Sequence, residues 1–286
     1  MQNLEFWKSQ GYTAVNLSRT TNPKIISIAN QKGGVGKTTT TINLGAALAR
    51  CGRRVLLIDL DPQGNASTGL GIEPADRIET TYELLTGDAL PAEAALPTSV
   101  ENLLIIPATT DLSSADINLM SNEKRSYMLH DALHQPDIDA LDLDYILIDC
   151  PPSLNILTVN AMIASDAVVV PLQSEFFALE GLSQLMLTIR DIRQTANPAL
   201  RIEGIVLTMY DKRNNLCQQV EVDARENLGE LVFKTVIPRN VRLSEAPSFA
   251  LPIIDYDPAS KGSHAYLALA EEIVSRESNP KPRRAS

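Results

Sequence analysis

The chain has 286 residues, of which 44% are hydrophobic and 21% charged, and these values are typical of globular proteins. They exclude a wholly disordered chain and a fibrous repeat. The formal net charge is −10, but residues 1–180 carry 11 basic and 22 acidic side chains, whereas residues 181–286 carry 14 and 13. The excess of acidic side chains therefore lies within residues 1–180. A basic surface built mainly from the last third of the chain is compatible with this composition.

Cysteine spacing and the N-terminal residues indicate the compartment. Cys51, Cys150 and Cys217 form no C-x-x-C pair, which favours free thiols over a metal or redox site. Residues 1–20 contain charged side chains and no apolar core typical of a secretory signal. No apolar run approaches the roughly 18 residues that a membrane helix needs. The sequence therefore predicts a cytoplasmic protein.

The chain begins with residues 1–23, which lack sustained periodicity and are expected to form a flexible N-terminal extension. A β-branched run at 24–30 then predicts a strand. A glycine-rich turn follows, and the apolar spacing over 38–50 predicts a helix. Cys51-Gly52 ends that helix, and the apolar run at 54–59 predicts a second strand, buried on both faces.

The alternation of strand and helix continues along the chain. The expected strands are 103–106, 145–149, 167–171, 202–209 and 231–237, and the expected helices are 126–133, 181–195, 218–227 and 266–274. This order predicts an α/β fold, a mostly parallel twisted sheet with helices on both faces. We expect a single domain over 24–277 and a disordered, proline-interrupted tail over 278–286.

The sharpest motif lies at the first strand–helix junction, and it reads Lys32-Gly33-Gly34-Val35-Gly36-Lys37-Thr38-Thr39. Glycines let backbone N–H groups approach a phosphate closely, and a helix N-terminus favours an anion. Lys37 then supplies a charge to the β- and γ-phosphates, and the Thr38 hydroxyl can bind Mg²⁺. The general G-x-x-x-x-G-K-[ST] pattern has glycine where this chain has Gln31, so what stands here is a variant with an extra lysine, Lys32.

Acidic residues follow two of the predicted strands. Asp59 and Asp61 lie in the segment 56–65, and Asp149 lies in 146–152. Because ligands of open α/β sheets gather beyond the carboxyl ends of the strands, these aspartates are candidates for a Mg²⁺–nucleotide site. An aspartate after a strand is also a common turn residue, and the phosphate loop is what favours the functional interpretation.

These segments resemble the ParA/Soj partition ATPases, the deviant Walker A branch of the P-loop NTPases, over about residues 24–273. The motifs are NQKGGVGKTTT at 30–40, LLIDLDPQGN at 56–65, LIDCPPSL at 147–154, PLQSEFFALEGL at 171–182, IPRNVRLSEAPS at 237–248 and YDPASKG at 256–262. The resemblance is to the bacterial chromosomal type. It implies a slow ATPase that uses ATP and Mg²⁺.

The resemblance implies a role for each site residue. Lys32 would reach the ATP of a partner subunit in a sandwich homodimer, and Lys37 would act within its own loop. Asp61 would orient the attacking water, while Thr38, Asp59 and Asp149 would surround Mg²⁺. Phosphoryl transfer depends mainly on positioning and charge neutralisation, which fits this set. The adenine would lie against Thr208-Met209 and Pro238-Arg239-Asn240, although the latter segment also reads as a plain turn.

The resemblance further implies non-specific binding of double-stranded DNA by the ATP-bound dimer. Candidate contacts are Arg190, Arg193, Arg201, Lys212, Arg213, Arg239, Arg242 and Lys261. The sequence has no recognisable base-reading motif, so contacts to the phosphate backbone and a steep salt dependence are expected. A ParB-like centromere-binding protein would stimulate hydrolysis and release the DNA, placing the protein at the nucleoid.

Three alternatives remain at this point. A membrane-surface ATPase resembling MinD needs a basic amphipathic C-terminal helix, and residues 270–277 carry Glu271 and Glu272 instead. A redox carrier resembling the nitrogenase iron protein needs cysteines placed for a shared cluster, which the three cysteines do not suggest. A metabolic ligase needs a pocket for a co-substrate, and no segment of the sequence indicates one.

Overall fold

The computed structural model of the chain describes residues 22–114, 124–175 and 178–278. The predicted N-terminal extension and C-terminal tail therefore lie outside the described residues, apart from Asn22, Pro23 and Ser278. None of the described helices has a stretch long and apolar enough to span a lipid bilayer.

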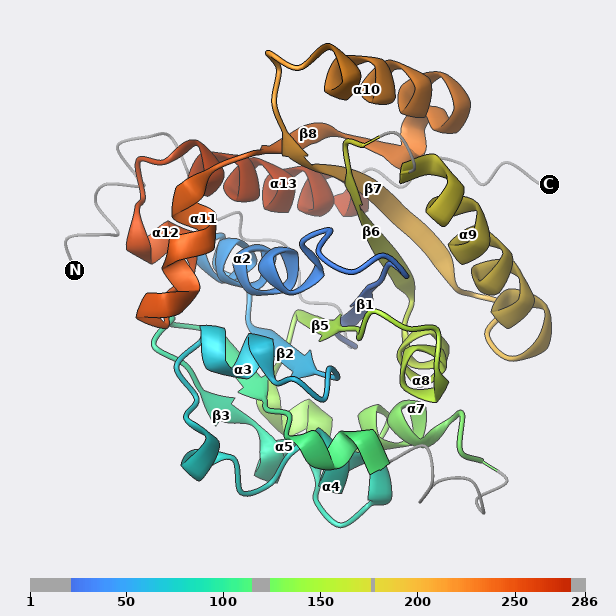
Figure 1. Cartoon of the computed structure of the whole chain (residues 1–286). Helices are drawn as coiled ribbons and strands as arrows, with labels where there is room; N and C mark the ends of the chain where they lie inside the picture. Colours follow the sequence, from blue (N-terminus) through green and yellow to red (C-terminus); the bar gives the residue numbers. More distant parts are fainter. Residues whose placement is uncertain (1–21, 115–123, 176–177, 279–286) are drawn as a thin grey trace.

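Within the described residues, eight strands form one twisted sheet in the order β3-β4-β2-β5-β1-β6-β7-β8 (Figure 1). Each neighbouring pair is parallel except β3 and β4. The strands are β1 (Lys24–Ile28), β2 (Val55–Asp59), β3 (Leu96–Pro97), β4 (Leu103–Ile106), β5 (Tyr145–Asp149), β6 (Ala167–Gln173), β7 (Arg201–Tyr210) and β8 (Val232–Pro238). The mostly parallel sheet predicted from the sequence is confirmed.

Helices cover both faces of this sheet, also as predicted. The α-helices are α2 (Lys37–Arg50), α3 (Asn65–Gly69), α4 (Thr81–Thr86), α5 (Pro91–Ala94), α7 (Met128–Leu133), α8 (Ile156–Ala164), α9 (Ala178–Thr195), α10 (Asn215–Leu228), α11 (Val241–Glu245), α12 (Ile253–Tyr256) and α13 (Lys261–Ser278). Short 3₁₀ segments are η1 (Pro74–Asp76), η2 (Thr110–Ser114), η3 (Pro136–Leu141), η4 (Gly229–Leu231) and η5 (Ala246–Phe249).

The predicted elements differ from the observed ones mainly at their ends. The first strand stops at Ile28 rather than at Asn30, because the Asn30 side chain bonds to other backbone groups: its amide donates to the Pro171 carbonyl at 2.7 Å and its Oδ1 accepts from Lys32 N at 3.0 Å. The helix expected at 266–274 begins at Lys261 and ends at Ser278. The elements that had not been predicted are β3, the helices α3, α4, α5, α8, α11 and α12, and the 3₁₀ segments.

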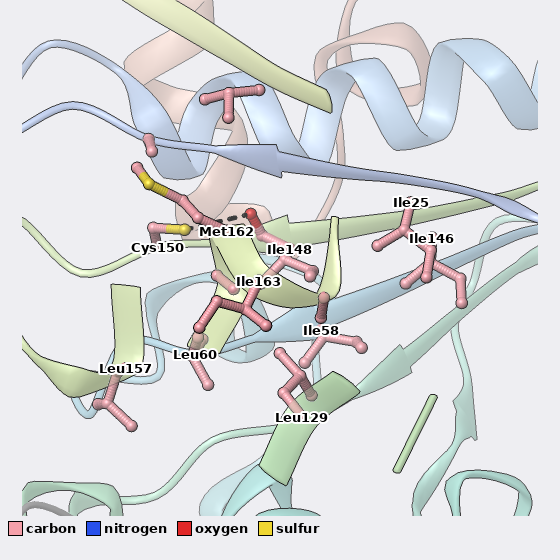
Figure 2. Packing of buried hydrophobic residues seen from close by; sticks show 14 of the residues in the cluster. Ile25, Ile58, Leu60, Leu129, Ile146, Ile148, Cys150, Leu157, Met162 and Ile163 are labelled. Atoms are coloured by element: carbon pink, nitrogen blue, oxygen red, sulfur yellow. Dashed lines mark hydrogen bonds between the residues drawn. The ribbon is translucent and has the colours of Figure 1, made fainter. Parts of the chain in front are cut away.

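The central strands are buried on both faces, so their side chains divide between two cores. Ile146 and Ile148 of β5 point into the core covered by α4, α7, α8 and α9, whereas Tyr145 and Leu147 point into the core under α2, α12 and α13. Figure 2 shows the first core, where side chains of the strands meet side chains of α7 and α8: Ile25, Ile58, Ile146, Ile148, Leu129, Leu157, Met162 and Ile163. Burying one such side chain stabilises the fold by about 1.5–3 kcal/mol.

Helix α2 lies beside α13 on the second face of the sheet (Figure 1). The Thr40 and Tyr266 hydroxyls share a hydrogen bond of 3.2 Å between these helices, and both groups are buried. Leu44 and Leu48 are completely buried on the same helix. This packing fixes the first turn of α2 at the carboxyl edge of the sheet, where β1, β2 and β5 also end.

Candidate functional site

The loop between β1 and α2 forms an open cradle. Gly34 has φ 74° and Gly36 has φ 88°, both in the left-handed region that glycine tolerates best. A Cβ placed on Gly33, Gly34 or Gly36 would have no neighbouring heavy atom within 4 Å. Gly36 precedes α2 and caps it with no side-chain hydrogen bond, so N–H groups of the first turn stay available to an anion. The predicted phosphate loop has the backbone that phosphate binding requires.

Lys37 is held inside this cradle. Its side chain is buried, and Nζ donates to the Lys32 carbonyl at 3.2 Å. Burial lowers the pKa of the Lys37 ammonium, and the nearby carboxylates of Asp149 and Asp61 oppose that shift. An anionic ligand would favour the charged form further, because it would replace the lost hydration of the ammonium with an opposite charge.

Asp59 and Asp149 lie opposite each other at the ends of adjacent strands. The register of β2 and β5 pairs the two residues, and both side chains are completely buried. Asp59 accepts hydrogen bonds from Ser67 N at 2.8 Å and from Ser67 Oγ at 2.7 Å. Burial raises the pKa of each carboxyl, and their mutual repulsion raises that of Asp149 further.

The donors around Asp149 suit a hard divalent cation. Thr41 Oγ1 donates to Asp149 Oδ1 at 2.9 Å, whereas Oδ2 is buried and makes no hydrogen bond of ordinary geometry. The Thr38 hydroxyl also approaches this carboxylate and helps to lower its pKa. The described residues contain no cluster of three or more His, Cys, Asp or Glu side chains able to hold a metal alone. Mg²⁺ at phosphates commonly takes one or two carboxylates and water, so Thr38, Asp59 and Asp149 fit a Mg²⁺–nucleotide site.

Asp61 begins the loop that connects β2 to α3. Its Oδ1 accepts from Gln63 N at 2.9 Å, and its carbonyl accepts from Gly64 N at 2.9 Å. The side chain is 9% exposed, and it is close enough to Lys37 and Asp149 to influence their charges. Asp61 therefore lies where it can face a ligand in the phosphate loop.

Lys32 makes a contact that was not expected. Its ammonium forms an ion pair with Glu175 Oε2 at 2.8 Å within the same chain, and Gln173 Nε2 lies against Glu175 Oε1. Both members of the pair are exposed, with 40% of the Lys32 side chain and 52% of the Glu175 side chain accessible. The predicted role of Lys32 toward a partner subunit would require this pair to open.

The segments predicted to receive the base lie at the ends of β7 and β8. Thr208 Oγ1 donates to the Val35 carbonyl at 2.8 Å, which joins β7 to the phosphate loop. The next residue, Met209, has φ 51° and is 38% exposed, an unusual backbone for a residue with a long side chain. Asn240 caps α11 by accepting from Arg242 N at 2.9 Å, so its Oδ1 is already occupied.

The eight basic residues predicted to contact DNA are all exposed, but they form two groups. One group lies at the carboxyl edge of the sheet and contains Lys212, Arg213, Arg239, Arg242 and Lys261. The other follows α9, which runs back from the end of β6 towards the start of β7, and contains Arg190, Arg193 and Arg201. Several already pair with neighbouring acids: Arg190 with Asp191, Arg201 with Glu203, Arg213 with Asp211, and Arg242 with Glu245 and Asp257.

Four residues support the site. Three of them, Asn30, Thr41 and Ser67, had not been singled out from the sequence, whereas Thr208 had been predicted only as a neighbour of the adenine. Asn30 and Thr208 fix the phosphate loop, while Thr41 and Ser67 hydrogen-bond to Asp149 and Asp59. The partners of Thr208 and Thr41 and one of the two partners of Asn30 are distant in the sequence. Thr41 lies one turn inside α2 and Ser67 lies in the first turn of α3, and these positions were the available signal for them.

The three cysteines are free, as expected, and Cys150 and Cys217 are buried. Burial raises the pKa of the Cys150 thiol, so it is protonated and unreactive at neutral pH. Its Sγ lies 3.9 Å from the Ile148 carbonyl in the first core (Figure 2). Since the described residues form no metal cluster with these thiols, they provide no support for an iron–sulfur carrier.

Comparison with known proteins decides the family. A family model described as "AAA domain" matches residues 23–202. Chromosome partitioning protein ParA of Caulobacter vibrioides (strain NA1000 / CB15N) is 59% identical over 257 residues, which covers 90% of this chain and 96% of that protein. This chain belongs to the ParA/Soj family of P-loop ATPases. Sporulation initiation inhibitor protein Soj of Bacillus subtilis (strain 168) is 54% identical over 251 residues, covering 88% of this chain and 98% of that protein.

A solved structure with a similar fold also matches this chain. The crystal structure of cobyrinic acid a,c-diamide synthase from Mycobacterium smegmatis, with bound ADP and magnesium, superposes with a TM-score of 0.79. It is 37% identical and covers 91% of this chain and 97% of that chain. The P-loop fold predicted from the sequence is confirmed, and the nucleotide and metal in that crystal agree with the expected cofactors, ATP and Mg²⁺.

Proposed function

We propose that this member of the ParA/Soj family is a DNA-partitioning ATPase whose assembly is switched by its nucleotide. ATP with Mg²⁺ binds at the loop 31–39 and promotes closure of a sandwich homodimer. The dimer binds double-stranded DNA without sequence preference, and a ParB-like protein stimulates hydrolysis and so releases the DNA. The cycle takes place in the cytoplasm, at the nucleoid.

One observation carries this proposal: two lysines of different environment share one open glycine loop. Lys37 is buried and bonded within the loop, whereas the side chain of Lys32 is exposed at the start of the loop and its ammonium pairs with Glu175. A lysine that serves only its own nucleotide has no need to lie on the outer side of the loop. An exposed cation next to a bound triphosphate suits a second subunit, because two nucleotides buried face to face bring negative charge that additional lysines offset.

The hydrolytic step needs little covalent help from the protein. When bound, Mg²⁺ neutralises charge on the phosphates that it contacts. Lys37 adds a positive charge from its desolvated position, and Asp61 orients the attacking water from the loop that begins after β2. Turnover by the isolated protein is slow because a switch must persist in its ATP state until its partner arrives. Positioning by these fixed groups is the main source of rate.

DNA binding is assigned to the exposed basic residues of the last third of the chain. Closure of a dimer would double each basic group, and phosphate contacts from both subunits would then act together. This additive effect explains why a protein with an overall charge of −10 can bind a polyanion only when assembled. The interaction is predicted to weaken steeply as salt increases.

The metabolic-ligase alternative has one supporting observation, the name of the synthase at 37% identity. The relatives named as partition proteins are more similar, at 59% and 54% identity. We therefore favour partitioning. The MinD-like alternative gains nothing from α13, whose described end still carries Glu271 and Glu272.

The decisive experiment measures mass and DNA binding in each nucleotide state. Light scattering and biolayer interferometry on non-specific duplex DNA are run with ADP, ATP and a slowly hydrolysed ATP analogue, and liposome co-sedimentation is run alongside. The wild type should dimerise and bind DNA with ATP or the analogue, and do neither with ADP. Lys37→Ala should lose both responses, whereas Asp61→Ala should retain both and lose turnover.

Two results would overturn the proposal. If ADP and ATP leave the mass and the DNA affinity identical, the switch does not exist. If Asp61→Ala hydrolyses ATP at the wild-type rate, the assignment of Asp61 is wrong. If the protein sediments with liposomes and does not bind DNA, the membrane-surface alternative is favoured instead.

A further inference from the structure

Arg77 is half-buried, and its guanidinium forms four hydrogen bonds. It follows η1, and its three guanidinium nitrogens donate to three different residues. Nε and Nη2 both donate to the Ile72 carbonyl, at 3.1 and 2.8 Å. Nη1 donates to the Ala108 carbonyl at 2.9 Å, and Nη2 also donates to Thr68 Oγ1 at 2.8 Å. One planar side chain therefore joins α3, the turn after it and the segment that follows β4.

This guanidinium lies directly against the loop that begins at Asp61. A Cβ on Gly64 would lie 2.3 Å from Arg77 Nη1 and 3.0 Å from the Ala108 carbonyl. Gly64 has φ 61° and donates its N–H to the Asp61 carbonyl at 2.9 Å. The backbone between Asp61 and α3 is thus packed on Arg77.

The same residues connect Arg77 to the carboxylate beside the phosphate loop. Ser67 Oγ donates to Asp59 Oδ2 at 2.7 Å and accepts from Ala108 N at 3.0 Å. The Ala108 carbonyl in turn accepts from Arg77. Ser67 is therefore bonded to Asp59, and Ala108 is bonded both to Ser67 and to Arg77, so this chain of hydrogen bonds runs from Asp59 to the guanidinium.

We propose that Arg77 is a positioning residue for ATP hydrolysis, which holds the loop 61–64 so that Asp61 keeps its place at the site. Its effect on turnover rests on the proposed function, whereas its effect on the loop does not. Lysine cannot replace it, because an ammonium is a compact point donor and these acceptors require a planar fork. Among the described residues, Arg77 forms no hydrogen bond with the phosphate loop, so it acts through Gly64 and α3.

The first test measures backbone hydrogen exchange in the nucleotide-free protein, and needs no activity. Arg77→Met retains a long side chain but removes every donor. We expect faster exchange within 62–70 and unchanged exchange in α2 and α13. The matched control is Arg276→Met, which removes an arginine that also bonds a backbone carbonyl, at Glu203, and stacks on the Phe233 ring at 4.2 Å, far from Asp61. Unchanged exchange over 62–70 in Arg77→Met would overturn the inference.

The second test separates turnover from binding. Arg77→Met should lower the ATP turnover number by about 10-fold or more, while its dissociation constant for ATP changes by less than about 3-fold, since small misplacements act mainly on the reacting geometry. Guanidinium ion, well below denaturing concentrations, should partly restore turnover to Arg77→Ala and not to Arg276→Ala. Thr68→Val, which removes a single acceptor, should lower turnover less than Arg77→Met.

Each outcome of the kinetic test has one meaning. Wild-type turnover in Arg77→Met, or equal loss of turnover and ATP affinity in both arginine variants, would refute a positioning role. If the wild type itself does not hydrolyse ATP, the proposed function fails instead, and the exchange experiment still decides whether Arg77 holds the loop.

Discussion

Asp59 and Asp149 face each other across β2 and β5, and both are completely buried at the carboxyl edge of the sheet. Two like charges in a buried site are unfavourable, so the pair tends to keep a proton when no cation is present. The same arrangement becomes favourable once a divalent cation lies between the strand ends. The folded protein therefore contains an electrostatic repulsion between these two carboxylates, and a bound metal–nucleotide complex would relieve it.

The first prediction concerns the pH dependence of stability. Burial raises the pKa of both carboxyls in the folded state, so above the ordinary carboxyl pKa of about 4 the folded protein binds more protons than the unfolded chain. The free energy of unfolding should then fall as pH rises through that window. Asp149→Asn should flatten this dependence and raise the melting temperature of the nucleotide-free protein at neutral pH, while Mg²⁺-dependent ATP binding is lost.

Thermal melts followed by circular dichroism between about pH 5 and 8 measure the effect. Asp139→Asn, at an exposed position, is the control and should track the wild type. Parallel pH curves for Asp149→Asn and the wild type would contradict the assignment of a raised pKa to this pair.

The second prediction concerns the bond between β7 and the phosphate loop. Thr208→Val has nearly the same volume but leaves the buried Val35 carbonyl without its donor. An unsatisfied buried carbonyl costs about 1–3 kcal/mol, and part of this cost should appear as weaker ATP binding because the loop loses its fixed position. We expect an affinity roughly 5-fold to 10-fold lower by titration with a fluorescent ATP analogue. Thr208→Ser, which keeps the hydroxyl, should bind normally, and equal affinities in both variants would refute the role.

How much of the structure could be predicted from the sequence depends on how far apart in the chain the interacting residues lie. The β1–loop–α2 unit and the aspartates after β2 and β5 are local patterns, in which glycine positions, a helix start and the ends of apolar runs all lie within a few residues. Those features were predicted, and the fold follows from repeating them. The helix α8 was missed because its residues 156–164 are almost all apolar, so they lack the periodicity that distinguishes a helix from a strand.

The supporting contacts could not be predicted for the opposite reason. Thr208 and Val35 are 173 positions apart, and Lys32 and Glu175 are 143 apart. Arg77 and Ala108 come together only because the segments after α3 and β4 return to the same edge of the sheet. No local pattern marks these pairings, since they are set by the order of the strands.

The third prediction concerns the ion pair between Lys32 and Glu175. Because both side chains are largely exposed, the pair contributes little to stability, of the order of 0–1 kcal/mol. Glu175→Gln should therefore leave the melting temperature unchanged, yet it frees Lys32 for a second subunit. We expect this variant to dimerise at a lower protein concentration than the wild type in the presence of the slowly hydrolysed ATP analogue.

Analytical ultracentrifugation over a concentration series measures this shift. Lys32→Ala is the opposing control and should fail to dimerise at any ATP concentration that saturates the monomer. A Glu175→Gln variant with the wild-type dimerisation constant would show that the ion pair does not compete with assembly.

The final prediction compares two adjacent residues on the group of basic side chains at the carboxyl edge. Arg213 donates from Nε and Nη2 to both oxygens of Asp211, at 3.0 and 2.9 Å, and these bonds lower the pKa of Asp211 to about 2. Lys212 is exposed, and no ion pair with it is found among the described residues.

If this group binds DNA phosphates, Lys212→Ala should reduce the slope of log K against log salt by about 0.9 per subunit, as expected for one lost phosphate contact. Arg213→Ala should reduce it much less, because the guanidinium is already neutralised and Asp211 would be left exposed. Binding to duplex DNA across a salt series with the ATP analogue measures both slopes, and a larger effect from Arg213 than from Lys212 would mean that the Asp211 pair opens on DNA.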